Sequence, residues 1–254
     1  SPAIVNVRHR VVMAARSDVH VIITGDTGTG KELVSRAIHS YSAISGGPFV
    51  AHNCALSPPE LFESEFFGHR RGSFTGADRD HAGLLRQADG GVLFLDELET
   101  MLAAHQAKLL RVIDDGEVRS VGAEQSQRVS VRFLAATNRD PEVMMQERTL
   151  REDLYYRLRG IEIRLPTLSQ RLDDIPLLAQ HFAGADCAGF TPDALDALMH
   201  AEWQGNVRQL RNVVQGAKAA AGGGKIGVAH LSLQSGGRVS RQFAGDGEHP
   251  RESE

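Results

Sequence analysis

The chain has 254 residues, of which 41% are hydrophobic and 24% are charged, so its composition is that of an ordinary soluble globular protein. Its formal net charge of −4 supplies no overall basic field for nucleic acid, and any DNA contact would therefore have to be local. Two cysteines without CxxC spacing exclude a disulfide framework or a zinc site, and no apolar run approaches a membrane span, so we expect a cytoplasmic protein without membrane contact.

The first two-thirds of the chain alternate between strand and helix patterns. Short apolar runs, rich in β-branched or aromatic residues, predict buried strands at 19–24, 48–52, 91–95, 131–137 and 161–165. Amphipathic helical patterns at 31–41 and 101–115 lie between them. This alternation predicts an α/β domain, residues 1–166, with a mostly parallel five-stranded sheet flanked by helices.

The pattern changes after Pro166. The sequence then predicts three helices, at 175–183, 191–203 and 206–221. We therefore expect a small helical domain over residues 167–221, packed on the α/β domain. From residue 222 onward the chain is rich in glycine, serine and charge, which predicts a flexible, disordered tail over 222–254.

The stretch GDTGTGK, residues 25–31, follows the first predicted strand and opens the first predicted helix. This is the context of a phosphate-binding loop, in which glycines let backbone N–H groups converge on phosphate oxygens and the helix dipole adds to the attraction. Lys31 can place its charge on the β- and γ-phosphates. Glu32 stands where the generic motif has Ser or Thr, so the usual hydroxyl ligand for Mg²⁺ is missing.

A second unusual stretch is HRRGSFTGADRD, residues 69–80, in which Phe74 stands alone between two glycines and among charges. Glycine and aspartate favour turns, and the charges favour water. Two interpretations stay open from this stretch alone. Either Phe74 anchors the loop in the core, or the loop presents Phe74 to a partner.

The predicted strand LFLDE, residues 93–97, ends in two carboxylates. Asp96 is placed to hold Mg²⁺, directly or through water, and Glu97 to polarise an attacking water. Asn138 ends another predicted strand and could orient that water or contact the γ-phosphate, although without the other motifs strand-end turn chemistry is the favoured explanation. Together with the phosphate loop, the acidic pair predicts a hydrolytic nucleotide site.

These stretches resemble the AAA+ domain of bacterial enhancer-binding proteins, the activators of sigma-54 RNA polymerase, from residue 1 to residue 214. The most specific element is GSFTGA, which matches the family signature GAFTGA, a surface loop that engages sigma-54. Further matching stretches are GDTGTGKE, NCALSPPELFESEFFGH, GGVLFLDE, FLAATNRD, LREDLYYRL and NVRQLRN. The resemblance implies that the partner-binding residues are Gly72, Ser73, Phe74, Thr75, Gly76 and Ala77.

The resemblance also implies roles at the nucleotide. Asn53 matches the asparagine that pairs with the catalytic glutamate, here Glu97, in a nucleotide-dependent switch, and Asn138 matches the sensor I position. Arg151 and Arg157 match arginines that reach the neighbouring subunit's nucleotide. ATP would be bound by the sensor II arginine of the helical lid and by the loop, namely Arg208, Gly25, Asp26, Thr27, Gly28, Thr29, Gly30, Lys31 and Glu32. The family also carries Glu after the lysine.

The implied function is an ATPase, with ATP and Mg²⁺ as cofactors, that assembles as a ring, expected to be a hexamer, and remodels the sigma-54 RNA polymerase holoenzyme. Alternatives are a general AAA+ remodeller and a nucleotide-binding regulatory module without turnover. Three departures stand out: Ser73 replaces alanine, Gln204 replaces the proline of WPGN, and Glu99 adds negative charge near Glu97. We see no helix-turn-helix after residue 221, so DNA binding is not visibly encoded here.

Overall fold

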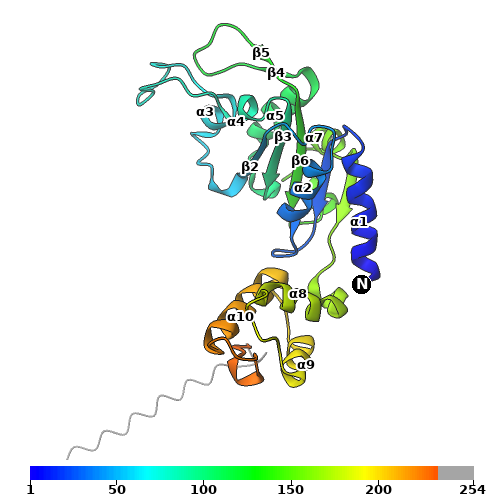
Figure 1. The fold of residues 1–254 in the computed structure, drawn as a ribbon. Helices are drawn as coiled ribbons and strands as arrows, with labels where there is room; N and C mark the ends of the chain where they lie inside the picture. Colours follow the sequence, from blue (N-terminus) through cyan, green and yellow to red (C-terminus); the bar gives the residue numbers. More distant parts are fainter. Residues whose placement is uncertain (234–254) are drawn as a thin grey trace, which may run out of the picture.

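The computed structural model describes residues 1–233, so the predicted tail beyond residue 233 lies outside the described residues. A five-stranded sheet forms the centre of the first domain, in the order β2-β3-β6-β1-β7, and all of its neighbouring strands are parallel (Figure 1). The strands are β1 (Val21–Thr24), β2 (Phe49–Asn53), β3 (Gly91–Asp96), β6 (Val131–Thr137) and β7 (Ile161–Arg164). The predicted α/β class and five-stranded sheet are confirmed.

Burial explains the composition of the central strands. All four residues of β1 are buried, and β3 and β6 are buried over nearly their whole length. Strands covered on both faces bury apolar side chains on both, so they read as continuous rather than alternating apolar runs. The parallel register brings the carboxyl ends of the strands to one edge, where Asn53 lies opposite Asp96 and Thr24 opposite Thr137.

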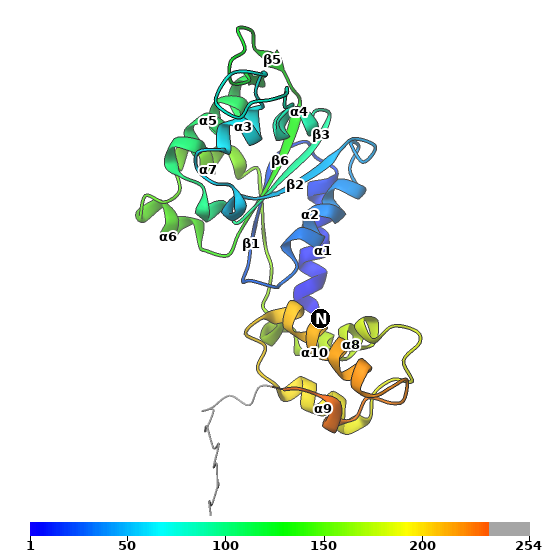
Figure 2. The same ribbon diagram turned by 90° about the vertical axis from the view of Figure 1, so that its left-hand side faces the viewer.

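Helices cover both faces of the sheet (Figures 1 and 2). On one face lie α1 (Pro2–Ala15) and α2 (Lys31–Ser40), which share a hydrophobic cluster with β1. The opposite face of the sheet shares a larger hydrophobic cluster with five helices. They are α3 (Phe62–Phe67), α4 (Leu84–Gln87), α5 (Ala103–Asp115), α6 (Pro141–Gln146) and α7 (Glu152–Leu158). Short 3₁₀ turns occur at Cys54–Leu56 (η1) and Leu98–Thr100 (η2). No helix within residues 1–233 is long and apolar enough to cross a bilayer.

The second domain has its own core and consists of a 3₁₀ segment, η3 (Leu168–Asp174), and three helices, α8 (Ile175–Ala183), α9 (Pro192–His200) and α10 (Asn206–Ala220). The tail was expected to begin at residue 222, but residues 222–233 pack on this domain. Ile226 is fully buried and bridges Phe190, and a further 3₁₀ turn, η4 (Val228–His230), follows. The glycines before it concealed this return of the chain to the core.

Two loops project from the far end of the α/β domain, away from the helical domain (Figures 1 and 2). One is the 69–81 loop, which follows α3 and is closed by a bridge between His69 and His81. The other is the hairpin of β4 (Glu117–Val118) and β5 (Gln127–Arg128). His69 also bridges Val121, so the hairpin lies directly against the base of the 69–81 loop.

Candidate nucleotide site and partner loop

The phosphate-binding loop connects β1 to α2 at the carboxyl edge of the sheet. Gly25, Gly28 and Gly30 all have positive φ, at 153°, 79° and 107°, a region that side chains with a Cβ rarely adopt. The carbonyls of the loop all have donors, while the amides of Gly28 and Gly30 donate to no acceptor among the described residues. Free amides at the start of a helix fit a phosphate, so this loop meets the requirement of the predicted site.

Lys31 lies over this loop. Its Nζ donates to the carbonyls of Gly25 (2.6 Å) and Asp26 (3.2 Å). Burial lowers the pKa of Lys31, and the nearby carboxylate of Asp96 opposes that shift. The half-buried ammonium is therefore held by carbonyl oxygens that phosphate oxygens could replace.

Glu32 turns away from the loop. Its carboxylate accepts two hydrogen bonds from Arg36, one turn later on the exposed side of α2. The side chain therefore offers nothing to a metal ion in this structure, and only its position in the first helical turn brings Glu32 near a phosphate.

The Asp96 carboxylate at the end of β3 lies close enough to Lys31 for each charge to influence the pKa of the other group. Burial raises the pKa of Asp96, while the amide of Glu97 and the charge of Lys31 act in the opposite direction. Glu97 adopts a left-handed backbone conformation (φ 55°), which is uncommon outside glycine and is a form of strain often found at functional sites. No group of three metal-binding side chains occurs within residues 1–233. Asp96 is a carboxylate at this edge that could hold a Mg²⁺.

Asn53 and Asn138 occupy the same edge of the sheet. Asn53 lies beside Asp96 in the strand register, but its Oδ1 accepts a hydrogen bond from the Ala55 amide, and no hydrogen bond joins it to Glu97. The backbone amide of Asn138 donates to one carboxylate oxygen of Glu99 at 3.4 Å. The other carboxylate oxygen of Glu99 is buried without a hydrogen-bond partner. Glu99 is thus a third carboxylate at this edge.

The two candidate trans-acting arginines lie elsewhere on the surface. Arg151 pairs with Asp153 (2.7 Å) and Arg157 with Asp114 (2.7 Å). Burial lowers the pKa of His20, just before β1, and the charges of Arg132 and then Arg157 add to that shift. Arg157 therefore lies near the start of β1, whereas the phosphate-binding loop follows the opposite end of that strand. Neither arginine contacts this chain's own loop within the described residues.

The helical domain contacts the phosphate-binding loop. The backbone amide of Arg208 donates to the Gly28 carbonyl (3.2 Å), so Arg208 lies beside the phosphate-binding loop, and its role at a nucleotide stays a prediction. The loop also contacts Asn206 and Arg171, which sequence reasoning did not single out. The helical domain is therefore a lid that touches the loop directly.

The 69–81 loop has a folded geometry of its own. The Gly72 amide donates to the Ala77 carbonyl (2.8 Å) and the Ala77 amide to the Phe74 carbonyl (3.0 Å). Gly72 and Gly76 have positive φ with open space around them, so glycine serves the backbone conformation there and not a close contact. Phe74 is 40% exposed and packs edge-on against His69, so it is neither fully buried nor fully presented.

Ser73 packs against the neighbouring hairpin. A Cβ added to Gly122 would lie 2.7 Å from the Ser73 Cβ, and Gly122 itself has a φ of 77°. The Ser73 hydroxyl is buried without a hydrogen-bond partner. Glycine at position 122 therefore allows the 69–81 loop to dock on the hairpin, and the serine hydroxyl gains no bond there.

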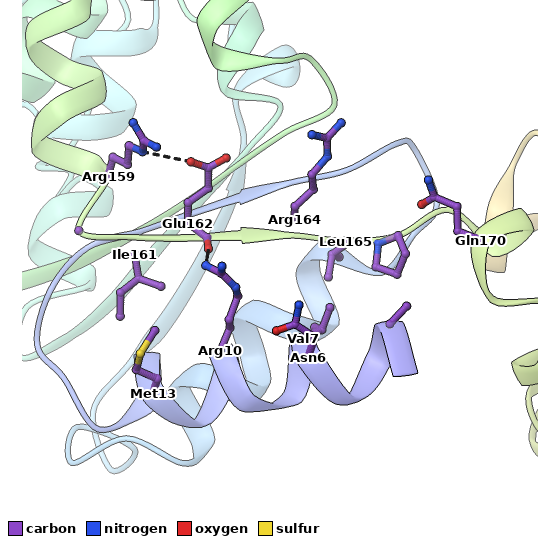
Figure 3. Close-up of a pocket in the computed structure, with 13 residues that line it drawn as sticks. Asn6, Val7, Arg10, Met13, Arg159, Ile161, Glu162, Arg164, Leu165 and Gln170 are labelled. Atoms are coloured by element: carbon purple, nitrogen blue, oxygen red, sulfur yellow. Dashed lines mark hydrogen bonds and ion pairs between the residues drawn. The ribbon is translucent and has the colours of Figure 1, made fainter. Parts of the chain in front are cut away.

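A hollow of about 690 Å³ lies beside the edge strand β7 and α1 (Figure 3). Arg10 crosses it to donate to the Glu162 carbonyl (2.8 Å), and the Glu162 carboxylate pairs with Arg159. None of the predicted catalytic side chains lines this hollow. A smaller one of about 290 Å³ adjoins it and is lined by Gly25 and Asn138, at the edge where the predicted site lies.

A parallel sheet with a phosphate-binding loop after β1, an acidic end to β3 and a helical lid defines a P-loop nucleotide-binding domain of the AAA+ class. Residues 1–164 match the sigma-54 interaction domain family, and residues 169–244 match the AAA+ ATPase lid domain family. The chain therefore belongs to the sigma-54 interaction domain family.

Individual relatives agree with this membership. Transcriptional regulatory protein ZraR of Salmonella typhimurium is 45% identical over 240 residues, covering 92% of this chain and 54% of that protein. The DNA-binding transcriptional regulator NtrC of Azospirillum brasilense is 45% identical over 221 residues, covering 85% and 46%. The structure of Brucella abortus NtrX in complex with ADP is similar with a TM-score of 0.82 at 36% identity, covering 91% and 54%. The chain spans about half the length of these relatives.

Proposed function

We propose that this chain hydrolyses ATP and uses that hydrolysis to remodel sigma-54 RNA polymerase through residues 72–77. The observation that carries the proposal is the joint presence, in one domain, of Lys31 beside Asp96 at the sheet edge and of a GSFTGA loop that projects at the far end. Membership of the sigma-54 interaction domain family and the likeness to ADP-bound NtrX support it.

The chain's own residues divide the work at the nucleotide. The Gly28 and Gly30 amides and Lys31 bind the phosphates, and Asp96 holds Mg²⁺, which when bound neutralises charge on the phosphate oxygens. Glu97 orients and polarises the attacking water. Asn138 lies beside the same hollow as Gly25 and helps to place that water.

The site is completed by a second copy of the chain in a ring, which we propose to be a hexamer. Arg151 and Arg157 are exposed and do not reach this chain's own phosphate-binding loop. On assembly, one of them leaves its carboxylate partner to stabilise charge on the neighbour's phosphoryl group, an effect worth about 10³–10⁵ in rate where such arginines are known. Surface ion pairs of this kind contribute only about 0–1 kcal/mol, so the exchange costs little.

Helix α3 is the mechanical link between the nucleotide and the 69–81 loop. It begins nine residues after Asn53 and ends two residues before His69. Its three phenylalanines are buried, and Phe62 stacks on Phe66 (4.1 Å between ring centroids) and on His105 (3.9 Å). A helix anchored in this way moves as a unit, so a switch of Asn53 between Ala55 and Glu97 would reposition the loop.

Phosphate release tests the enzymatic part. We expect the parent to release phosphate from ATP with a rate that rises more than linearly with protein concentration, and Glu97→Gln to lose nearly all of this activity. Equal, negligible release by both proteins would instead support a nucleotide-binding regulatory module.

Binding to sigma-54 tests the partner. The parent, loaded with ADP and a metal fluoride that mimics the transferring phosphoryl group, should bind sigma-54, and Phe74→Ala should bind at least about tenfold more weakly, since buried aromatic anchors dominate such contacts. Tyr41→Ala, which removes another exposed aromatic side chain, is the matched control and should bind like the parent. Unchanged binding by Phe74→Ala would remove the loop from the proposal, and remodelling of other proteins would remain the alternative.

A further inference from the structure

The lid holds the phosphate-binding loop by its backbone carbonyls. The Thr27 carbonyl accepts a hydrogen bond from Asn206 Nδ2 (3.0 Å), and the Gly28 carbonyl accepts one from the Arg208 amide (3.2 Å). The next carbonyl, that of Thr29, accepts from the guanidinium of Arg171 (3.1 Å). Three consecutive loop carbonyls are thus bonded to three lid residues.

These bonds determine where the loop amides point. The chain has no cis peptide bond within its described residues, and in a trans peptide the carbonyl and the following amide point in opposite directions. A lid donor on the Thr27 carbonyl therefore turns the Gly28 amide away from the lid, and a donor on the Thr29 carbonyl does the same for the Gly30 amide. Neither of these two amides has an acceptor among the described residues, and the proposed function assigns both to phosphate.

Asn206 is at the centre of this arrangement. It is only 2% exposed, and its backbone has a φ of 50°, a left-handed conformation that asparagine tolerates better than most residues. While its Nδ2 donates to Thr27, its Oδ1 accepts from the Leu168 amide (2.8 Å), at the start of the lid. The two bonds fix the orientation of the amide group, because a flipped side chain would face Leu168 with a donor and Thr27 with an acceptor.

The contact is also sterically tight. A Cβ on Gly28 would lie 2.3 Å from the Gly205 carbonyl oxygen, so the loop and the start of α10 touch through backbone atoms. The backbone amide of Asn206 donates to the Trp203 carbonyl (3.0 Å). Trp203 is the chain's single tryptophan and is buried in the lid core. The fluorescence of Trp203 can therefore report on changes in this turn.

We infer that Asn206 is a positioning residue that sets the direction of the phosphate-binding amides and ties nucleotide binding to the start of the lid at Leu168. This inference rests on the proposed nucleotide site. Asn206 does not touch the nucleotide in this account. It acts on the Gly28 amide through the Thr27 carbonyl, and on the start of the lid through the Leu168 amide.

The test is Asn206→Asp, which keeps the size, the tolerance for positive φ and the acceptor for Leu168, but replaces the donor with an oxygen that faces the Thr27 carbonyl. Asn212→Asp, which makes the same chemical change at an exposed position of α10, is the matched control. We expect the dissociation constant of a fluorescent ADP analogue to rise about 10- to 50-fold in Asn206→Asp, as expected for a lost hydrogen bond that leaves two oxygens opposed, and less than twofold in the control. The ADP-induced change in Trp203 emission should also be lost only in Asn206→Asp.

A measurement on the parent covers the case in which Asn206→Asp does not fold. The Leu168 amide is buried and takes no part in phosphate binding, yet its exchange with solvent should slow on adding ADP, by up to about 100-fold at 100 times the dissociation constant. If the parent binds ADP but Leu168 exchange is unchanged, or if Asn206→Asp binds ADP as tightly as the parent, the coupling inferred here is wrong. If the parent binds no nucleotide, the proposed function fails first.

Discussion

The contact between Gly122 and Ser73 yields a prediction about how the 69–81 loop is held down. In Gly122→Ala the new methyl carbon would lie 2.7 Å from the Ser73 Cβ, whereas carbon atoms pack at about 3.5–4.0 Å. Neither carbon sits at the end of a flexible side chain, so the hairpin and the 69–81 loop must separate by about 1 Å. We expect the substitution to displace the loop from its docked position.

The loss of stability in Gly122→Ala has two parts, and a comparison with Gly90→Ala separates them. Alanine at a positive φ costs about 1–2 kcal/mol, and this part is matched by Gly90→Ala, whose φ of 73° is similar to the 77° of Gly122 but whose Cβ would meet no atom within 4 Å. Overpacking costs about 1–3 kcal/mol more, and this part applies to Gly122→Ala alone. Ser73→Gly removes the opposing Cβ, so the double variant should lose the overpacking part.

Urea unfolding of the parent, the three single variants and the double variant measures these terms as free energies of unfolding. Gly122→Ala should be less stable than Gly90→Ala by about 1–3 kcal/mol, and most of that difference should vanish when Ser73→Gly is added. If Gly122→Ala is no less stable than Gly90→Ala, or if Ser73→Gly leaves its cost unchanged, the loop does not dock on the hairpin as described.

Three further predictions concern single side chains. Ser73→Ala should raise the free energy of unfolding by about 1 kcal/mol, because the buried hydroxyl has no partner, and a loss of stability in urea unfolding would show that the hydroxyl is bonded after all. Gly28→Ala should weaken binding of a fluorescent ADP analogue by at least about tenfold, because its Cβ would meet the Gly205 carbonyl at 2.3 Å; binding like that of the parent would contradict the contact. Burial raises the pKa of the Cys54 thiol to about 12, so only about one Cys54 thiol in 10⁴ is ionised at pH 8. A thiol-reactive chromophore should therefore label Cys187 first and Cys54 only on unfolding. Fast labelling that persists in Cys187→Ser would contradict this.

The parts of the fold that were predictable are those whose signal is local in sequence. The strand at 131–137 was found with its observed bounds because a buried parallel strand is apolar on both faces. Helix α1 was missed because its pattern is mixed: Val7 and Val11 are buried, but Val5, Val12 and Met13 are exposed, which blurs the apolar stripe.

The same distinction between local and long-range signals applies to the residues of the site. The phosphate-binding loop and the LFLDE strand end carry their chemistry in consecutive residues, so the sequence brought them into view directly. The bond between Asn206 and Thr27 joins residues 179 positions apart, and the contact of Ser73 with Gly122 joins two loops, so neither leaves a local pattern. The only sequence trace of the first is an asparagine placed directly after a glycine at the start of a helix, where a positive φ is tolerated.

The proposed mechanism requires a working site that is shared between two copies of the chain. Mixing two inactive variants tests it most directly. Glu97→Gln lacks the water-polarising carboxylate but keeps its arginines, and Arg157→Ala keeps its own loop and carboxylates but donates no arginine at that position. Phosphate release by the mixture should rise clearly above the sum of the separate proteins, because an Arg157 from the first variant can act at an intact Glu97 of the second. The same test with Arg151→Ala decides which arginine acts. If every mixture stays at the sum of its parts while the parent is active, each chain hydrolyses ATP alone and the shared site is wrong.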